Sequence, residues 1–381
     1  MNRTTKSLIA AVAAFSFVAA ACSSDKKAAE TTVAATTAPS TAETTAPSTA
    51  ETTAASTGTG EAVSIDTNGD GKVVIGVATP GPRDDGGYYQ ALVDGVTDFS
   101  AANGFDKPII VDNIKAEEAS SALDGLARQN VDMIAVGAGE IGDPLADLTV
   151  KYPDIIWYCN CGAGHAPLPN LIQSGDDGAE MGYSAGVATG ILMRDRKTDP
   201  TAAMLGNNNF PFEIEAFKSF ELGLQSVDPT FTATYVATNS FNDVAAATEA
   251  FNNLKDQGIG AIWPYLGGAA DAVVKLSNEN DVITMSAGAS DACERTDLKF
   301  DIAVRFDAGD YLDTILNEIL AGKLKRGETR AFHVGVDPQG GAVICDPTAE
   351  ETTEMTAAYA LIASGDLLDQ FGAIKGEAYG G

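Results

Sequence analysis

The sequence is poor in positively charged side chains and in histidine. Its 24 lysine and arginine residues stand against 53 aspartate and glutamate residues, which gives a formal net charge of −29 at pH 7. Proteins that bind nucleic acids present a basic face, so this excess of acidic residues argues against a nucleic-acid partner. The two histidines, His165 and His333, are too few and too scattered for a zinc site with the usual ligand spacing. We therefore expect neither a metal nor a cofactor.

The apolar run near the N-terminus, LIAAVAAFSFVAAA, is too short to span a bilayer, which takes roughly 20 apolar residues as a helix. It follows the basic residues Arg3 and Lys6 and ends in small residues directly before Cys22, which predicts a secretory signal peptide over residues 1–21. Small residues followed at once by cysteine resemble a bacterial lipobox, in which the cysteine is acylated and becomes the first mature residue. The alternative is an ordinary signal peptide cut nearby, with Cys22 incidental.

Residues 22–61 contain almost no side chain that can be buried. They consist largely of Thr, Ala, Ser, Pro and Glu and include the near repeat TTAPSTAETTAPSTAE. Such a composition cannot form a packed core, so we expect a disordered tether between the membrane and the folded region. Residues 62–71, with the polar stretch DTNGDG, are expected to form a lead-in turn to the first strand.

Cysteine is rare, and its number is informative. Apart from Cys22 the chain has Cys159, Cys161, Cys293 and Cys345. An even number in an exported protein predicts disulfides, with three possible connectivities. Our preferred pairing is Cys293 with Cys345, which leaves Cys159 and Cys161 free or strained.

Apolar runs alternate with helical patterns from residue 72 onward. Strands are expected at 72–78, 108–113, 131–137, 154–159, 202–206, 231–237, 260–265, 281–288 and 331–336. Helices are expected at 86–102, 116–129, 144–152, 178–193, 212–225, 243–257, 268–279, 308–322 and 349–364. Repeated strand–helix units with near-continuous apolar strands predict an α/β protein with parallel sheets covered on both faces. About 310 residues exceed one hydrophobic core, so two doubly wound lobes are expected.

Two short motifs suggest enzymes but lack the context that the chemistry needs. GAGEIG (137–142) has the glycine spacing of a dinucleotide site, yet the next strand ends in Cys161 rather than in the required carboxylate. Its glycines, Gly139 among them, are better explained by a close approach of backbone to a ligand or to the next helix. GYSAG (182–186) places Ser184 inside a helix instead of on a sharp turn after a strand, so a serine hydrolase with His333 is a remote alternative.

Aromatic and hydrogen-bonding residues gather directly after several predicted strands. In doubly wound lobes these loops all face one edge, where two lobes would enclose a cleft suited to a flat polar molecule. The candidate ligand-binding residues are Asp84, Asp85, Tyr88, Tyr89, Gln90, Asn209, Phe210, Phe212, Trp263, Tyr265, Gly267, Ser286 and Gly288. The alternative for any one of these aromatic residues is packing in the core or between the lobes.

Residues from about 72 to 340 resemble the basic membrane protein (BMP) family of ABC-transporter substrate-binding lipoproteins, whose best-understood members bind purine nucleosides. The resemblance rests on the first loop, DDGGYYQALVDGV, on VKYPDIIW (150–157), APLPNLI (166–172) and GAEMGYSAGVATG (178–190), and on SFNDVAAATEAFNNLKDQGIGAIWPYLGG (240–268). It implies a type I periplasmic-binding-protein fold, in which two lobes joined by a hinge close on a solute.

Carried over residue by residue, the resemblance implies a base held between Tyr88 of one lobe and Trp263 of the other, and a basic residue at Arg305. Two departures matter. Tyr89 stands where the family has an asparagine, and Ser286 to Gly288 supply no carboxylate where the family has an aspartate for the ribose hydroxyls. Loss of that acceptor would weaken sugar binding unless another group substitutes. We therefore expect a small polar, heteroaromatic ligand that is nucleoside-like, with other flat heteroaromatic molecules or a different polar solute as alternatives to a nucleoside.

The sequence therefore predicts a monomeric, lipid-anchored solute-binding protein on the extracytoplasmic face of the cell membrane. It would deliver a small solute to the permease subunits of an ABC importer and would have no enzymatic activity. One lobe is expected from 72–172 with 289–331, and the other from 173–288 with 332–381. The alternative is a sensor that presents its ligand-bound form to a membrane signalling partner.

Overall fold

The computed structural model describes residues 65–162 and 165–380. The predicted signal peptide, the candidate acylation site Cys22 and the predicted tether lie outside the described residues. No helix within the described ranges is long and apolar enough to cross a membrane.

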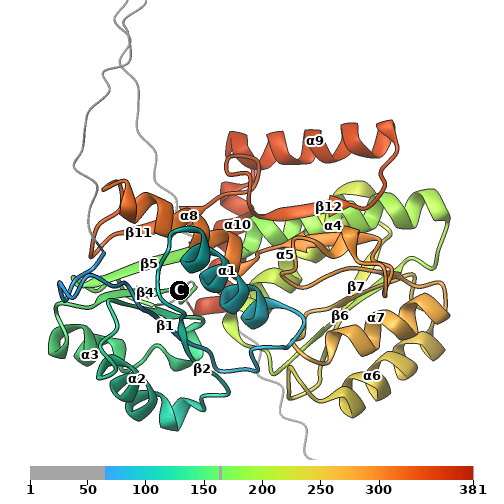
Figure 1. Ribbon diagram of the computed structural model, residues 1–381. Coiled ribbons are helices and arrows are strands. Elements are labelled where there is room, and N and C mark those ends of the chain that lie inside the picture. The colour runs from blue at the N-terminus through green and yellow to red at the C-terminus, as the bar shows by residue number, and fades with distance from the viewer. Residues whose placement is uncertain (1–64, 163–164, 381) are drawn as a thin grey trace, which may run out of the picture. The chain divides into compact units, whose positions relative to one another are not determined.

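The first sheet has six parallel strands, in the spatial order β11-β5-β4-β3-β1-β2. They are β1 (Ile75–Ala78), β2 (Ile109–Val111), β3 (Met133–Val136), β4 (Ile156–Cys159), β5 (Leu171–Asp176) and β11 (Thr329–Phe332). The central strands β1, β3 and β4 are buried at every position, as parallel strands covered on both faces must be. The helices between these strands are α1 (Tyr88–Ala102), α2 (Ala119–Ala127), α3 (Leu145–Lys151) and, before β11, α8 (Ala308–Leu320) (Figure 1).

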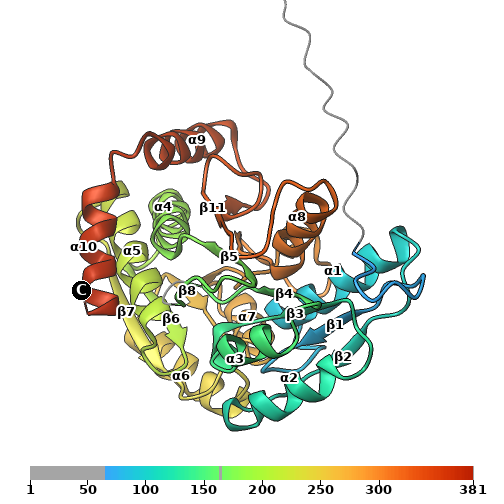
Figure 2. The ribbon, with the colours of Figure 1, turned by 90° about the vertical axis from the view of Figure 1, so that its left-hand side faces the viewer.

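The second sheet has four parallel strands in the order β7-β6-β8-β9. They are β6 (Thr201–Gly206), β7 (Thr232–Ala237), β8 (Ala261–Pro264) and β9 (Ile283–Thr284). Single bridges join the segment after β9 to β10 (Ile302–Arg305), which pairs antiparallel with β12 (Gly341–Ile344). The helices of this part are α4 (Gly178–Arg196), α5 (Pro211–Val227), α6 (Val244–Gln257), α7 (Ala270–Glu279), α9 (Ala349–Ser364) and α10 (Leu368–Tyr379). Figure 2 shows α9 and α10 at the outside, beside α4 and α5. Short 3₁₀ turns occur at Ala116–Glu118, Gly139–Ile141 and Ala292–Glu294.

This arrangement confirms the predicted α/β class with doubly wound parallel sheets. Four elements lie outside the predicted ranges: β5, β10, β12 and α10. The predicted lobe boundaries stay a prediction, but strand pairing differs from them at two places. Strand β5 lies in the first sheet although most of it was assigned to the second lobe, and β10, assigned to the first lobe, lies beside β9 and β12. Both strands directly precede a connection from one part of the fold to the other, and apolar periodicity does not show on which side of such a connection a strand lies.

Helix α4 is the small-residue helix of the sequence, and it packs closely on α5. A Cβ atom added at Gly186 would lie 2.1 Å from the Phe220 carbonyl oxygen, so only glycine permits this approach. Ser184 is fully buried within α4, where its hydroxyl donates to the Met181 carbonyl and accepts from the Ala342 amide. The residue therefore has a structural role and is not on the strand–helix turn that a hydrolase nucleophile requires.

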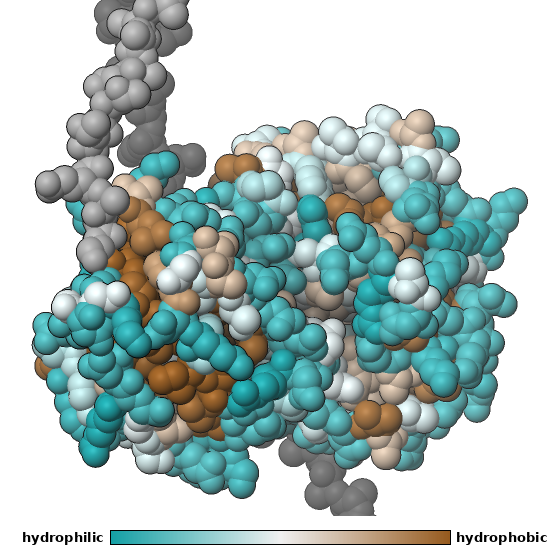
Figure 3. Space-filling view, in the orientation of Figure 1, coloured by the Kyte–Doolittle hydropathy of each residue, from teal (hydrophilic) through white to brown (hydrophobic). Residues whose placement is uncertain are grey.

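Two disulfides join the four cysteines of the folded region. Cys293 is bonded to Cys345, which agrees with the preferred pairing. Cys159 is bonded to Cys161, so these two residues are not free thiols. Cys159 is the last residue of β4 and Cys161 follows it in the loop, so this second disulfide lies at the carboxyl end of the first sheet. The face of the molecule in Figure 3 is mostly hydrophilic, with hydrophobic residues gathered in small patches.

Candidate ligand-binding cavity

A cavity of about 240 Å³ lies where the carboxyl ends of the parallel strands of both sheets meet. Ligands bind at this edge in open α/β sheets because the loops there carry side chains that no strand buries. The lining residues come from segments that follow strands of both sheets and from α10: Asp85, Tyr88, Tyr89, Ala138, Gly139, Glu140, Asn160, Cys161, Gly162, His165, Asp176, Gly178, Met181, Phe212, Glu215, Phe241, Tyr265, Leu266, Gly267, Ala287, Phe306 and Tyr379.

Aromatic rings from segments that follow different strands lie in contact with one another at the wall of this cavity. Tyr88, at the start of α1, lies 6.2 Å from Phe306, which follows β10. Phe306 in turn stacks on Tyr265, which follows β8, with ring centroids 5.5 Å apart and an angle of 20° between the planes. Phe212 lies 6.3 Å from Tyr265. These rings give the cavity flat apolar walls with hydroxyl groups at intervals, which suits a planar polar molecule.

The carboxylate of Asp85 shapes the first loop. It accepts backbone hydrogen bonds from Gly87 (3.0 Å), Tyr89 (3.4 Å) and Gln90 (3.0 Å), and so supplies acceptors to the amides at the start of α1. This fixes Tyr88 and Tyr89 at the cavity wall. Burial raises the pKa of Asp85, and the three amides lower it in part. Asp84, by contrast, is exposed and does not line the cavity.

Trp263 does not line the cavity, contrary to the expectation of a Tyr88–Trp263 sandwich. It lies within β8 and is fully buried, and its indole N–H donates to the Ser286 carbonyl over 3.1 Å. Two residues further along, Tyr265 lies beyond the end of the strand and takes the place at the wall. Trp263 supports it from behind, in an edge contact with centroids 5.2 Å apart.

Two other predicted residues, Arg305 and Ser286, are also not part of the cavity lining. The side chain of Arg305 donates to the Gly340 and Gly341 carbonyls and so ties β10 to β12. The Ser286 hydroxyl accepts from the Val304 amide and joins the segment after β9 to β10.

The remaining predicted residues outside the lining are held by local contacts. The Gln90 side chain donates a hydrogen bond to Asp94 within α1. The backbone amide of Asn209 donates to the Tyr235 hydroxyl. Gly288 adopts a positive φ of 101° beside Phe306. Phe210 stacks on Phe212, with centroids 5.6 Å apart. The predicted residues that do line the cavity are Asp85, Tyr88, Tyr89, Gly139, Phe212, Tyr265 and Gly267.

Gly139 has the close-approach role that the sequence suggested for the glycines of its motif. A Cβ atom there would lie 2.6 Å from the Cys161 carbonyl oxygen and 2.6 Å from Nε2 of His165. Any side chain at this position would therefore displace the loop after β4 from the cavity wall. The glycine shapes the cavity between two loops of the first sheet.

Three carboxylates at the cavity were missed by the sequence reasoning: Glu140, Asp176 and Glu215. Asp176 ends β5, and the pair of aspartates before the glycine that opens α4 was the available signal. Glu215 lies on the buried face of α5, where its Oε1 accepts the Ala179 amide and its Oε2 accepts the Tyr379 hydroxyl. Together these residues make the cavity acidic as well as aromatic.

The Asp176 carboxylate receives little hydrogen bonding from the rest of the protein to offset its burial. The hydrogen bond that lowers its pKa comes from its own backbone, and within the described ranges no other residue donates to its side chain. Burial, with a smaller contribution from the charge of Asp177, raises the pKa of Asp176 to about 6. A carboxylate in this state favours a ligand group that donates to it.

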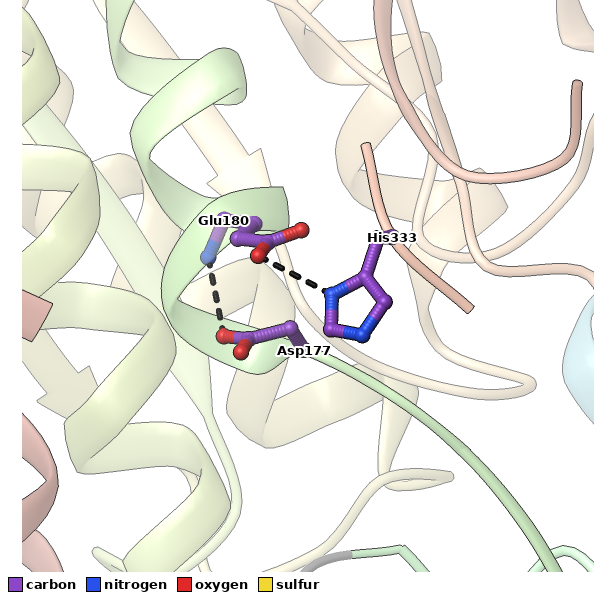
Figure 4. Close-up of side chains that lie close together, drawn as sticks. All are labelled: Asp177, Glu180 and His333. Atoms are coloured by element: carbon purple, nitrogen blue, oxygen red, sulfur yellow. Dashed lines mark hydrogen bonds and ion pairs between the residues drawn. The ribbon is translucent and has the colours of Figure 1, made fainter. Parts of the chain in front are cut away.

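A cluster of three titratable side chains lies outside the cavity lining and consists of Asp177, Glu180 and His333 (Figure 4). Asp177 accepts the Ala179 and Glu180 amides and so begins α4. Glu180 accepts from the Val334 amide over 2.9 Å, and its other oxygen lies 3.1 Å from Nδ1 of His333. These contacts tie α4 to the segment after β11, so each of the three has a structural role.

Comparison with models of known protein families gives a match over most of the chain. The family model described as Bmp, ABC transporter substrate-binding protein PnrA-like, matches residues 72–335. No curated protein matches the chain.

Solved structures share the fold at low sequence identity. A solute-binding protein of an ABC transporter system from Aeropyrum pernix K1 superposes with a TM-score of 0.61 at 13% identity, over 81% of this chain and 92% of that one. A solute-binding protein from Conexibacter woesei DSM 14684 gives 0.58 at 19% identity, over 77% and 97%. A transcriptional activator of the comK gene from Bacillus halodurans gives 0.60 at 15% identity, over 76% and 96%.

Proposed function

Because the chain belongs to the Bmp family of PnrA-like ABC transporter substrate-binding proteins, we propose that it captures a small, polar, heteroaromatic solute in the cavity between its two sheets. The solute is nucleoside-like in carrying a flat ring with hydrogen-bonding edges. The protein then delivers it to the permease subunits of an importer, without a catalytic step.

The observation that carries this proposal is the aromatic wall of the cavity. Tyr88 follows a strand of the first sheet, Tyr265 follows a strand of the second, and Phe306 follows β10 beside the second sheet, so a ring bound against these side chains contacts both parts of the fold. A ligand that contacts both sides stabilises the closed arrangement over the open one, which is the requirement for closure about a hinge. The lining carboxylates and Asn160 would bind the polar edge of the ring.

The location proposed for this activity is the outer face of the cell membrane. The small residues before Cys22 support cleavage and acylation at that cysteine, and the polar sequence of residues 22–61 supports a tether. Acyl chains on one residue would hold the protein at the membrane near its permease, since two chains are enough for stable anchoring.

Native mass spectrometry of the full-length protein tests the proposed ligand class. The protein is measured as purified and again after addition of a panel of nucleosides and nucleobases. We expect one of them to bind the wild type, to be lost from Tyr265→Ala, and to be retained by Trp263→Phe, because Tyr265 forms the wall and Trp263 lies behind it. Circular dichroism shows that each variant is folded.

Two results would contradict the proposal. If a folded wild type binds none of the panel, the nucleoside-like ligand is wrong, although the family assignment stands. If a nucleoside binds but Tyr265→Ala binds it equally well, the solute is held somewhere other than this cavity.

A further inference from the structure

The charged side chains that line the cavity are predominantly acidic. Four carboxylates line it (Asp85, Glu140, Asp176 and Glu215), and its described lining includes no lysine or arginine. His165 is the one histidine in the described part of the lining. Lys375 lies nearby on α10, but its ammonium group is 2.5 Å from Asp177 and 4.0 Å from Glu215, and it is not part of the lining.

Two of the four carboxylates are used by the protein itself. Asp85 accepts three amides at the start of α1. Glu215, which is 1% exposed, accepts the Ala179 amide and the Tyr379 hydroxyl. These bonds satisfy both oxygens of each group, so neither residue needs a ligand.

Asp176 is different from both. It ends β5 and lines the cavity, and within the described ranges no other residue donates a hydrogen bond to its side chain. The remaining lining carboxylate, Glu140, belongs to an exposed residue. Asp176 lines the same cavity as Tyr88 and Tyr265. Burial raises the pKa of both tyrosines, and the charge of Asp176 raises it further. Removing a carboxylate from water without a partner is costly, and a cation recovers much of that cost.

We propose that the solute is an organic cation, a flat ring that carries a protonated amine or amidine, with its positive group against Asp176 and its ring against the aromatic wall of Tyr88, Phe306 and Tyr265. This inference rests on the proposed function and adds the charge of the ligand. Aromatic faces strengthen the preference, because Tyr rings attract cations within about 6 Å. The net charge of −29 also raises the local concentration of cations at the cavity mouth.

Two sets of matched probes isolate the charge from the ring. The first set is 5′-amino-5′-deoxyadenosine, adenosine and adenosine-5′-carboxylate, and the second is tryptamine, indole-3-ethanol and indole-3-acetate. Within each set the ring is constant and the substituent is cationic, neutral or anionic at pH 7. Binding to the full-length protein is measured by isothermal titration calorimetry for the wild type, Asp176→Asn and Asp281→Asn. Asp281 is an exposed surface residue with a φ of 56°, a conformation that asparagine adopts readily, so this variant removes one charge outside the cavity.

We expect the cationic member of at least one set to bind the wild type and Asp281→Asn ten times or more tightly than the neutral member, and the anionic member to bind weakest. In Asp176→Asn the difference between cationic and neutral members should fall to threefold or less. Equal binding of neutral and cationic members to the wild type would overturn the inference while leaving the proposed function intact. An unchanged preference in Asp176→Asn would also overturn it, and binding of no probe would count against the proposed function and the inference together.

Discussion

The hydroxyl group of Tyr379, in the last turn of α10, donates a hydrogen bond of 2.9 Å to Oε2 of Glu215 in α5. Both residues line the cavity, and α10 lies outside the region matched by the family model, which ends at residue 335. The C-terminal helix therefore contributes Tyr379 to the cavity lining and is bonded there to a buried carboxylate.

Replacing Tyr379 by phenylalanine should destabilise the protein at neutral pH. The ring remains, but a carboxylate that is 1% exposed loses a donor, which costs about 1–3 kcal/mol. Burial raises the pKa of Glu215 and the hydrogen bond from Tyr379 lowers it in part, so loss of the bond matters most where Glu215 is ionised and least in acid. Urea unfolding of the wild type, Tyr379→Phe, Glu215→Gln and the double variant measures the coupling. A double variant whose loss equals the sum of the single losses would show that the two groups do not interact.

Replacing Asp176 by asparagine should have the opposite effect on the ligand-free protein. The folded-state pKa of about 6 lies above the usual 3.8, so the folded protein binds a proton more tightly than the unfolded chain. The wild type therefore loses stability as the pH rises from about 4 to about 6, and the substitution removes this loss. We expect a gain of about 1–3 kcal/mol near pH 7, where the full shift sets the upper bound, and little difference near pH 4.

The difference between the two proteins is the measured quantity, because the buried acids Asp85, Glu180 and Asp307, whose pKa values are also raised, affect both equally. Glu215 adds a smaller change in the same direction, because the charge of Asp176 is one of the lesser causes that raise its pKa. Urea unfolding of both proteins at a series of pH values between about 4 and about 7 gives this difference in the free energy of unfolding. If Asp176→Asn is less stable than the wild type near pH 7, groups within the protein stabilise the ionised Asp176 carboxylate, and it does not need a ligand as a partner.

Most of the fold could be predicted from the sequence because apolar periodicity is a local property. Nine helices and nine strands were expected near where they occur. Strand β5 was missed because it contains Gln173 and Ser174, which are buried; the Ser174 hydroxyl is bonded to Tyr158, a partner that only the tertiary structure supplies. Helix α10 contains two glycines and buries only Phe371, so its own pattern is weak.

The site was less predictable because it depends on where strands end. Trp263 and Tyr265 are two residues apart, which is one period of a strand, and both are aromatic. Their roles separate only because β8 ends at Pro264. Asp176 was missed for the same reason, since its place at the strand end was unknown without β5. A local sequence pattern predicts where helices and strands occur. Which residue ends a strand depends on its pairing with strands that are distant in the sequence.

Removing the two disulfides separately should give unequal losses of stability. The Cys293–Cys345 bond joins residues 52 positions apart, and the Cys159–Cys161 bond joins residues only 2 apart. The entropy lost from the unfolded chain grows with loop length, so the first bond should contribute about 4 kcal/mol and the second about 1–2 kcal/mol. Thermal unfolding of the two Cys→Ser double variants measures this. Equal losses would show that the native environment of the short disulfide, beside the cavity, outweighs its effect on the unfolded chain.

The last prediction concerns the close contact between α4 and α5, which a pair of glycine variants can test. A Cβ atom at Gly186 would lie 2.1 Å from the Phe220 carbonyl oxygen and 2.8 Å from the Leu224 amide nitrogen, both backbone atoms that cannot move alone. Overpacking of this kind costs about 1–3 kcal/mol or more, which exceeds the gain of about 1 kcal/mol from replacing a helical glycine by alanine. We therefore expect Gly186→Ala to be less stable than the wild type.

Gly372, in the exposed part of α10, is the matched control. An added Cβ meets nothing within 4 Å there, so only the backbone term remains, and Gly372→Ala should gain about 0.5–1 kcal/mol. Urea unfolding of the two variants beside the wild type gives both values. If Gly186→Ala proved as stable as Gly372→Ala, α4 and α5 would have to move apart at little cost. Since α4 begins directly after Asp177, next to Asp176, and α5 carries Glu215, such a movement would also change the cavity, and the binding of any solute found there should change with it.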